Sequence, residues 1–523
     1  MSERANTGNV ANIGSVADIP AVHAAATPDK AAILHFDGEL TYGALDRNAN
    51  RVANGLRAMG LDRQSRVILL SKNDPRYFEL FFGAARAGMA LAPANWRLTA
   101  EELTFVIQDS QAPLVFVSSE YAPLIASIRA DLPAVRDVIV FDEGYAEWLD
   151  AQSDAPLSLA RDPEDDVLQL YTSGTTGLPK GAMLTDRTMM FYLRQMAVSP
   201  VGPYGPGTLV MVPLPLFHVG GACWGLNALY NGEADLLLRE ASAPVIVEAF
   251  RRFPVTKAGM VPAVMKMVID HPDAADIDFS RLDTLSYGAS PISQELLAQV
   301  QQVFACNLVQ MFGMTESCSL ATFLPPEDHV PERAEKMLSV GKAAQGVGLR
   351  IVGPDGADLP AGQSGEVLLS GENIMKGYWQ RPADTQKAIV GGWYYSGDAG
   401  YLDSEGYLFL RDRIKDMIIS GGENVYSAEV ERVLFSNPDI ADVAVIGVPH
   451  PVWGEAVKAV VVPAAGARVD EASVIAHART KLAGYKCPKS VDFVDALPRN
   501  GSGKVLKRDL RAPYWEGQER SVA

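Results

Sequence analysis

A loop rich in glycine and hydroxyl side chains carries the clearest chemical signal in the sequence. An apolar run at 167–171 leads directly into this loop, and Lys180 follows shortly after it. The loop consists of Thr172, Ser173, Gly174, Thr175, Thr176 and Gly177. Glycines let backbone amides approach a polyphosphate, hydroxyls add donors, and a lysine adds positive charge. These residue types, placed directly after an apolar strand, predict a phosphate-binding loop.

Two other interpretations of this loop fit its residues less well. Glycine, serine and threonine are also common in flexible surface loops, but such loops need neither the preceding strand nor the lysine. A Walker loop requires its lysine between a glycine and a serine or threonine. Here Lys180 lies between Pro179 and Gly181, which disfavours a kinase or P-loop ATPase.

From this loop outward, the sequence resembles the adenylate-forming superfamily, which includes acyl-CoA synthetases, luciferases and peptide-synthetase adenylation domains. The resemblance covers residues 41–511 and rests on separate motifs in the expected order. It implies an AMP-forming acyl-CoA synthetase, an acid–thiol ligase that activates a carboxylic acid as its acyl-adenylate. It also implies ATP, Mg²⁺ and coenzyme A as the cofactors and co-substrates.

The resemblance assigns an adenine-binding turn at 287–291 and a metal-binding motif at 310–316. The nucleotide-contacting positions in these two segments are Gly288, Ala289, Ser290, Gln310, Met311, Phe312, Gly313 and Thr315. Gly288 and Ala289 are small enough for a purine to lie on the backbone, and Phe312 can stack on its face. The family usually has tyrosine where this chain has Phe312, so a phenolic hydroxyl is missing. Magnesium prefers oxygen ligands, and Glu316 with Thr172 is the expected set.

Further positions matched to the family lie in the carboxyl-terminal third. Asp398 and Arg413 resemble the ribose contacts, and Lys415 falls on the hinge between the two domains. Paired Gly421 and Gly422 resemble the loop that lines the pantetheine tunnel, although such a pair also fits a simple turn. Lys504 resembles the lysine that bridges the acyl carboxylate and the α-phosphate. The residues expected to act in catalysis are Lys504, Glu316, Lys180 and His218.

His218 stands alone in an otherwise apolar segment at 212–221. A lone histidine in such a run is often a satisfied core residue, whereas the resemblance places it between the nucleotide and the acyl pocket. No acidic residue lies between Pro213 and Gly232, so the ammonium group of an amino acid would be left unpaired. We therefore expect a hydrophobic fatty or aryl (cinnamate-like) acid, with the choice between them open.

Composition limits the partners. The formal net charge of -17 repels nucleic acids, so we expect none. A basic cluster at 499–511 fits either a solvated face or a binding site. Residues 1–20 lack the apolar core of a secretory signal, no apolar run is long enough to span a bilayer, and four scattered cysteines suit a reducing cytoplasm.

The pattern of elements predicts an α/β protein. Helix and strand signals alternate from residue 40, and a β-rich stretch with Gly, Pro and Asp turns covers 341–410. We expect a large N-terminal domain at 1–412, with α/β layers and a β-rich subdomain. A small mobile α+β lid at 413–523 would follow, with its hinge at Lys415. Thr99 and Glu102 form a capping-box pattern and are assigned to structure.

Alternative activities remain within and outside this enzyme class. The adenylate could be loaded onto a carrier-protein thiol or oxidised, as luciferases do, or the chain could be a non-catalytic nucleotide-binding homologue. No carrier domain follows Arg511 in the sequence, which favours free CoA. Retention of the charged residues named above argues against a non-catalytic role. The oligomeric state stays open, a homodimer being one option.

Overall fold

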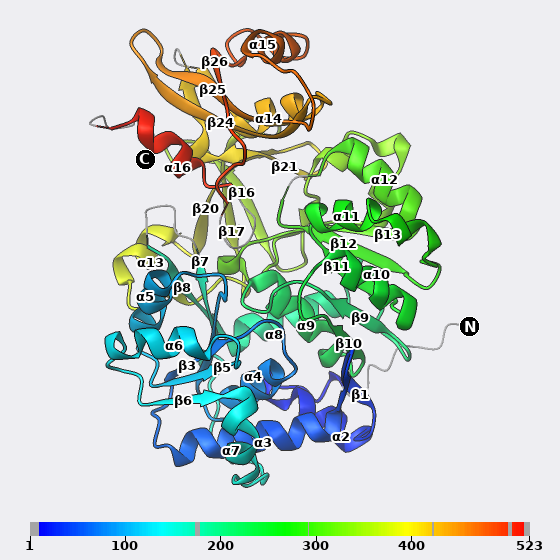
Figure 1. Ribbon diagram of the computed structural model, residues 1–523, viewed down its shortest axis with the longest axis vertical. Coiled ribbons are helices and arrows are strands. Elements are labelled where there is room, and N and C mark those ends of the chain that lie inside the picture. Colours follow the sequence, from blue (N-terminus) through cyan, green and yellow to red (C-terminus); the bar gives the residue numbers. More distant parts are fainter. Residues whose placement is uncertain (1–9, 173–177, 291, 421–422, 500–504, 517–523) are drawn as a thin grey trace. The chain divides into compact units, whose positions relative to one another are not determined.

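The computed structural model describes residues 10–172, 178–290, 292–420, 423–499 and 505–516 (Figure 1). The chain divides into two compact units. The first unit comprises Met1–Leu349 with Leu369–Tyr394, and the second comprises Arg350–Leu368 with Tyr395–Ala523. This division does not test where the chain bends, so the boundary at residue 413 and the hinge at Lys415 stay predictions.

A seven-stranded sheet in the first unit carries the predicted phosphate loop. Its strand order is β18 (Gly377–Tyr378), β8 (Lys180–Thr185), β7 (Asp166–Thr172), β4 (Ala90–Ala94), β3 (Arg66–Leu70), β5 (Leu114–Val117) and β6 (Asp137–Val140). The strands from β7 to β6 are parallel. At one edge of the sheet, β8 pairs antiparallel with β7, and β18 pairs antiparallel with β8. Strands β3, β4 and β5 are buried along their whole length, which fits a parallel sheet covered on both faces.

A nine-stranded sheet forms the other layer of the first unit. Its strand order is β15 (Lys342–Ala343), β14 (Thr322–Leu324), β13 (Asn307–Phe312), β12 (Thr284–Gly288), β11 (Lys257–Met260), β9 (Leu209–Val212), β10 (Ala234–Leu237), β1 (Ala31–His35) and β2 (Gly38–Thr41). The strands from β13 to β1 are parallel. Because ligands in such sheets bind beyond the carboxyl ends of the strands, the ends of β12 and β13 are the positions that matter for the site.

Helices cover both sheets of this unit (Figure 1). They are α2 (Ile19–Ala26), α3 (Tyr42–Ala58), α4 (Arg76–Arg86), α5 (Ala100–Ser110), α6 (Ala122–Ile128), α7 (Ala146–Asp150), α8 (Asp186–Ala197), α9 (Val219–Tyr230), α10 (Ala243–Arg252), α11 (Pro262–Ile269), α12 (Gln294–Phe304) and α13 (Pro382–Ala388). Buried side chains of α10, α11 and α12 pack against β9 to β13 in one apolar core. Those of α5 and α6 pack against β3 to β5 in another.

The capping box predicted at the start of α5 is confirmed. The Thr99 hydroxyl accepts from the Glu102 amide at 3.4 Å, and the Glu102 carboxylate accepts from the Thr99 amide at 2.8 Å. Both bonds satisfy amides that the helix itself leaves without partners. This segment therefore belongs to the structure of the unit, as its sequence indicates.

Strands joined in one sheet occupy the predicted β-rich stretch. A five-stranded sheet has the order β16 (Gly348–Val352), β17 (Gly365–Ser370), β20 (Trp393–Leu402) and β19 (Ile389–Val390), with β21 (Leu408–Arg413) paired to β20. The β20–β21 hairpin is antiparallel, and its register aligns Asp398 with Arg413. The hairpins expected in this stretch are confirmed here.

The second unit continues into a compact α+β arrangement. Its strands are β22 (Ile418–Ser420), β23 (Glu423–Val425), β24 (Ile440–His450), β25 (Gly454–Pro463) and β26 (Ser490–Phe493), and its helices are α14 (Ser427–Phe435), α15 (Glu471–Arg479) and α16 (Lys507–Arg511). Buried residues of α14 and α15 pack on the sheet in a separate core. The predicted fold class, α/β layers followed by a smaller α+β part, is confirmed. In the described part of the chain, every helix is too short or too polar to cross a membrane.

Candidate active site

The two ends of the predicted phosphate loop lie side by side on neighbouring strands. Thr172 ends β7, Lys180 begins β8, and the two residues are register partners. The Thr172 hydroxyl lies 3.5 Å from the carbonyl oxygen of Lys180. The strand that the sequence places before the loop is thus confirmed. The remaining loop residues, Ser173, Gly174, Thr175, Thr176 and Gly177, lie outside the described residues.

Lys180 and Glu316 contact the same tyrosine. Glu316 lies in a short helical turn, Thr315–Ser317, and its Oε1 accepts a hydrogen bond from the Tyr378 hydroxyl at 2.8 Å. The Lys180 ammonium lies 5.2 Å from the centroid of the Tyr378 ring and 3.2 Å from Oδ2 of Asp384. A cation and a carboxylate, separated widely in the sequence, are thereby brought to one place.

Tyr378 acts here as a hydrogen-bond donor. Burial, and then the neighbouring Glu316 carboxylate, raises the pKa of the Tyr378 hydroxyl, so the hydroxyl keeps its proton. Neither Tyr378 nor Asp384 was predicted from the sequence. The signal was weak because a tyrosine after a glycine fits an ordinary turn, and Asp384 fits the acidic first turn of a helix.

The donor types at this place fit a magnesium ion. Glu316 offers a carboxylate and Thr172 a hydroxyl, which are the hard oxygen ligands that Mg²⁺ prefers. In residues the structure describes, no group of three or more His, Cys, Asp or Glu could hold a metal. Mg²⁺ does not need such a group because it keeps several waters and is bound through one or two protein ligands plus substrate phosphates.

The predicted adenine turn and metal motif meet where β12 and β13 end. Gly288 is the register partner of Met311. A Cβ atom on Gly288 would lie 2.1 Å from the Met311 carbonyl oxygen, and one on Gly313 would lie 2.3 Å from the Ser319 backbone. Both glycines are therefore required by close backbone packing, whether or not a purine lies on them. Ala289 follows with a φ of 66°.

The other predicted nucleotide contacts occupy the same edge. Gln310 is buried, and its side-chain oxygen lies 3.5 Å from the Tyr287 hydroxyl. Phe312, the last residue of β13, is partly exposed, Thr315 begins the turn that carries Glu316, and Ser290 is exposed. The described sequence-predicted residues at the ends of β12 and β13 thus lie on adjacent strands or in the loops that follow them.

His218 precedes α9 as its N-cap residue. Its Nε2 atom is buried and has no hydrogen-bond partner among the described residues. Burial, and to a smaller extent the charge of Arg97, lowers the pKa of His218 to about 4. The imidazole is therefore neutral near pH 7. A core histidine normally has hydrogen-bond partners for its ring nitrogens, whereas Nε2 of His218 has none among the described residues. The role of His218 at the acyl pocket stays a prediction.

Asp398 and Arg413, the two residues predicted to contact the ribose, form an ion pair within the second unit. Arg413 Nε lies 2.8 Å from Asp398 Oδ1, and Arg413 Nη1 donates to the Ser396 carbonyl at 3.1 Å. The arginine thus fixes the orientation of a carboxylate that is only 6% exposed. Lys415 lies in the turn Ile414–Asp416 that follows β21. Gly421, Gly422 and Lys504 lie outside the described residues.

The basic cluster near the carboxyl terminus is largely engaged with acids of its own unit. Lys507 pairs with Glu431 at 2.7 Å, Arg511 with Asp416 at 2.6 Å, and Arg499 with Asp442 at 2.6 Å. The Lys507 and Arg511 side chains are only 13% and 11% exposed. These two cations therefore anchor α16 inside the unit, and neither belongs to a solvated face.

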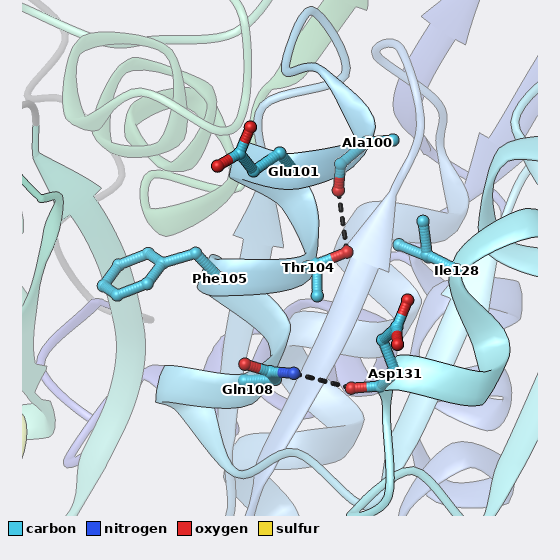
Figure 2. A pocket seen from close by; sticks show the side chains of 7 residues that line it. All are labelled: Ala100, Glu101, Thr104, Phe105, Gln108, Ile128 and Asp131. Carbon is cyan, nitrogen blue, oxygen red and sulfur yellow. Dashed lines mark hydrogen bonds between the residues drawn. The ribbon is translucent and has the colours of Figure 1, made fainter.

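A surface groove of about 440 Å³ lies elsewhere in the first unit, beside α5 and α6 (Figure 2). Its lining residues are Ala100, Glu101, Thr104, Phe105, Gln108, Ile128 and Asp131. Thr104 donates to the Ala100 carbonyl and Gln108 to the Asp131 carbonyl, as Figure 2 shows. These donors are thus committed to backbone acceptors, and no predicted site residue lines the groove.

Comparison with known proteins defines the class to which this site belongs. Residues 21–379 match the model of the AMP-binding enzyme family, and residues 429–504 match that of the AMP-binding enzyme C-terminal domain. The chain belongs to the AMP-binding enzyme family. The predicted adenylate-forming superfamily, the ligase class, and the use of ATP, Mg²⁺ and CoA are thereby confirmed for the family.

Individual relatives of the chain include ligases for fatty and aryl acids. The chain is 38% identical to a fatty acid–[acyl-carrier-protein] ligase, ScoC, of Streptomyces coeruleorubidus, over 96% of each chain. It is 39% identical to a feruloyl-CoA synthase of an Amycolatopsis species, over 95% of this chain and 98% of the relative. The crystal structure of ATP-bound MatB from Rhodopseudomonas palustris matches with a TM-score of 0.86 and 31% identity, covering 95% of this chain and 99% of MatB.

Proposed function

We propose that the chain is an ATP-dependent acyl-CoA synthetase that converts a hydrophobic carboxylic acid, ATP and CoA to acyl-CoA, AMP and pyrophosphate. The observation that carries this proposal is the convergence of Lys180 and Glu316 on Tyr378. A cation for the phosphates and a carboxylate for their metal are the two charges that adenylation needs in one place. The similarity to named CoA ligases supports the same reaction.

In the first half-reaction, a carboxylate oxygen of the substrate attacks the α-phosphorus of ATP. A new O–P bond forms, and the bond to pyrophosphate breaks. Lys180 and Lys504 would neutralise the anions that meet in this step, because positioning and charge compensation supply most of the catalysis in such transfers. Mg²⁺ held by Glu316 and Thr172 would supply further positive charge to the phosphate oxygens.

In the second half-reaction, the CoA sulfur attacks the acyl carbonyl carbon. A C–S bond forms, the C–O bond to AMP breaks, and the thiol proton passes to solvent. We propose that the second unit turns about Lys415 between the two steps, removing Lys504 and presenting Gly421 and Gly422 to the pantetheine arm. Closures of this kind use a few hinge residues and can limit turnover.

The substrate we propose is a hydrophobic fatty or aryl acid. The segment around His218 offers no acidic partner for an ammonium group, and the neutral state of His218 adds no charge to it. The relatives of this chain include a fatty acid–[acyl-carrier-protein] ligase and a feruloyl-CoA synthase, which supports both acid types. Desolvating an unpaired ammonium group in an apolar pocket disfavours an α-amino acid.

A panel of acids tests the proposal. The protein is mixed with MgATP, CoA and each of a set of fatty, cinnamic, benzoic and amino acids, and both pyrophosphate and acyl-CoA are measured. We expect equal amounts of both products with at least one hydrophobic acid and none with the amino acids. Pyrophosphate release without thioester for every acid would contradict the CoA assignment.

A carrier-protein thiol is the second candidate acceptor, because the relative ScoC is a fatty acid–[acyl-carrier-protein] ligase. The same assay with a phosphopantetheine-loaded acyl carrier protein in place of CoA separates the two acceptors. We expect CoA to be acylated faster at equal thiol concentration. Faster acylation of the carrier protein would reassign the enzyme as a carrier-protein ligase.

We further propose that the enzyme works in the cytoplasm, which supplies ATP and CoA and keeps thiols reduced. All four cysteines are free in the structure, which supports this placement. A homodimer stays a proposal, and light scattering of the purified protein measures the molar mass that decides it.

A further inference from the structure

The segment 373–384 of the first unit holds the turn that carries Glu316. The Asn373 side chain donates to the carbonyls of Ser317 and Leu320 at 3.2 and 2.6 Å. The Met375 amide donates to the Glu316 carbonyl at 2.8 Å. Because these bonds fix the backbone at Glu316 and in the residues that follow it, the segment 373–384 restricts the direction of the glutamate side chain.

The same segment also lies against the strand that begins with Lys180. Tyr378 is the register partner of Ala182 in the β18–β8 pair, and the Trp379 amide donates to the Gly181 carbonyl at 2.8 Å. Asp384 then approaches the Lys180 ammonium at 3.2 Å. One short stretch of chain therefore contacts both Lys180 and Glu316, the two charged residues that we propose bind MgATP.

Tyr378 is the residue through which this stretch reaches the Glu316 carboxylate. Tyr378 is nearly buried, with 9% of the residue exposed, and its hydroxyl donates a hydrogen bond to Oε1 of Glu316. A hydrogen bond to a charged acceptor is short and directional. With Oε1 held, rotation of the carboxylate is restricted and Oε2 is left for another ligand.

We propose that Tyr378 is a positioning residue that orients Glu316 toward the Mg²⁺ of MgATP. This inference rests on the proposed function, since it assigns the metal of that reaction to Glu316. Outer hydrogen bonds of this kind fix the orientation of metal ligands, and their loss commonly lowers metal affinity by about 10- to 100-fold.

The test replaces the hydroxyl alone. Tyr378→Phe and wild-type protein are titrated with ATP by calorimetry at a series of Mg²⁺ concentrations, without acid or CoA. We expect Tyr378→Phe to need about tenfold more Mg²⁺ for half of the Mg²⁺-dependent gain in ATP affinity. ATP binding without Mg²⁺ should stay unchanged. A wild-type Mg²⁺ requirement in folded Tyr378→Phe would overturn the proposal.

A matched control removes the same bond elsewhere in the unit. The Tyr145 hydroxyl donates to Oε2 of buried Glu79 at 2.6 Å, so Tyr145→Phe loses a tyrosine–glutamate bond away from the proposed metal site. We expect both variants to lose similar thermal stability, but only Tyr378→Phe to change the Mg²⁺ requirement. Equal changes of the Mg²⁺ requirement in both variants would reduce Tyr378 to a structural role.

A second measurement keeps the hydroxyl in place in case Tyr378→Phe does not fold. With 3-fluorotyrosine at position 378, the ¹⁹F resonance should shift when Mg²⁺ is added to the ATP-bound protein, because Glu316 is its hydrogen-bond acceptor. An unchanged resonance would overturn the proposal. Failure of the proposed function looks different: wild-type protein would bind MgATP normally but form no acyl-CoA.

Discussion

Three side chains of the first unit differ in how their polarity is compensated. Lys180 pairs with Asp384, and Glu316 accepts from Tyr378. His218, in contrast, keeps a buried Nε2 without a hydrogen-bond partner among the described residues. Compensated groups are held in position before any substrate arrives. The uncompensated imidazole instead has a pKa that depends on burial, and this gives the residue a measurable signature.

The acid sensitivity of folding should depend on His218. Its folded pKa of about 4 lies below its usual value of 6.5, so the unfolded chain binds the proton first. Stability is therefore lost as the pH falls from about 6.5 toward 4, by about 2 kcal/mol at pH 5 for this one group. His218→Gln cannot titrate and should lack this loss. Urea unfolding of both proteins at pH 7.5 and pH 5 measures it, and equal losses in both would contradict the shifted pKa.

Glu316→Gln should impair magnesium-dependent adenylation much more than folding. The amide keeps the size of the side chain and can still accept from Tyr378, but it lacks the charge that attracts a divalent cation. We expect at least a tenfold slower pyrophosphate release at modest Mg²⁺ with a nearly unchanged thermal midpoint. Asp150→Asn, which removes an exposed carboxylate paired with Arg51, is the control. Near-wild-type release by Glu316→Gln would remove the metal assignment.

The sequence proposes charged residues for the candidate site only where they occur in a dense local pattern. Lys180 follows a glycine–threonine run, and Glu316 closes a contiguous motif. Tyr378 and Asp384 have no such context because the residues they contact, Glu316 and Lys180, lie far away in the chain. The basic cluster at 499–511 shows that a local charge pattern can also leave its own role undecided. Charge alone could not reveal that Lys507 and Arg511 are paired with Glu431 and Asp416.

Among the elements, the paired ends of β12 and β13 position the predicted adenine turn. Their approach depends on Gly288, whose missing side chain leaves room for the Met311 carbonyl. The helix–strand alternation that builds this sheet was predictable, because buried strands and amphipathic helices differ in period. The pairing of β18 with β8 was not, since a two-residue strand has no period.

Gly288→Ala should destabilise the first unit even without nucleotide. A Cβ 2.1 Å from a backbone carbonyl forces the strands apart, and overpacking of this kind costs about 1–3 kcal/mol. Gly144→Ala is the matched control, because a Cβ there would meet nothing within 4 Å. Chemical denaturation of the nucleotide-free proteins compares them. An unchanged stability of Gly288→Ala would leave the purine as the sole reason for the glycine.

At the scale of the whole molecule, we assign the two half-reactions to two arrangements of its units. The family motifs indicated this division, because Lys504 and the Gly421–Gly422 pair resemble residues of different steps. Periodicity and spacing alone could not indicate it, since neither contains information about the movement that we propose for the units. The division of labour is testable because each step can be supplied with its own substrate.

Lys504→Ala and Gly421→Leu should separate the two steps. Without Lys504, the carboxylate and phosphate meet with one cation fewer, and adenylation should slow by about 10² to 10³. The same variant should still form thioester from chemically made acyl-AMP. Gly421→Leu should do the reverse, because a large side chain would fill the path of the thiol. Equal loss of both steps in both variants would contradict a two-arrangement mechanism.

The most direct test of the central claim follows the oxygen atoms of the acid. Wild-type protein is given a substrate acid labelled with ¹⁸O in its carboxylate, together with MgATP and CoA, and the products are analysed by mass spectrometry. If the carboxylate attacks the α-phosphorus and the thiol then attacks the acyl carbon, one ¹⁸O atom must remain in AMP for each thioester formed. Label in phosphate or pyrophosphate, with unlabelled AMP or ADP as the nucleotide product, would contradict an acyl-adenylate mechanism.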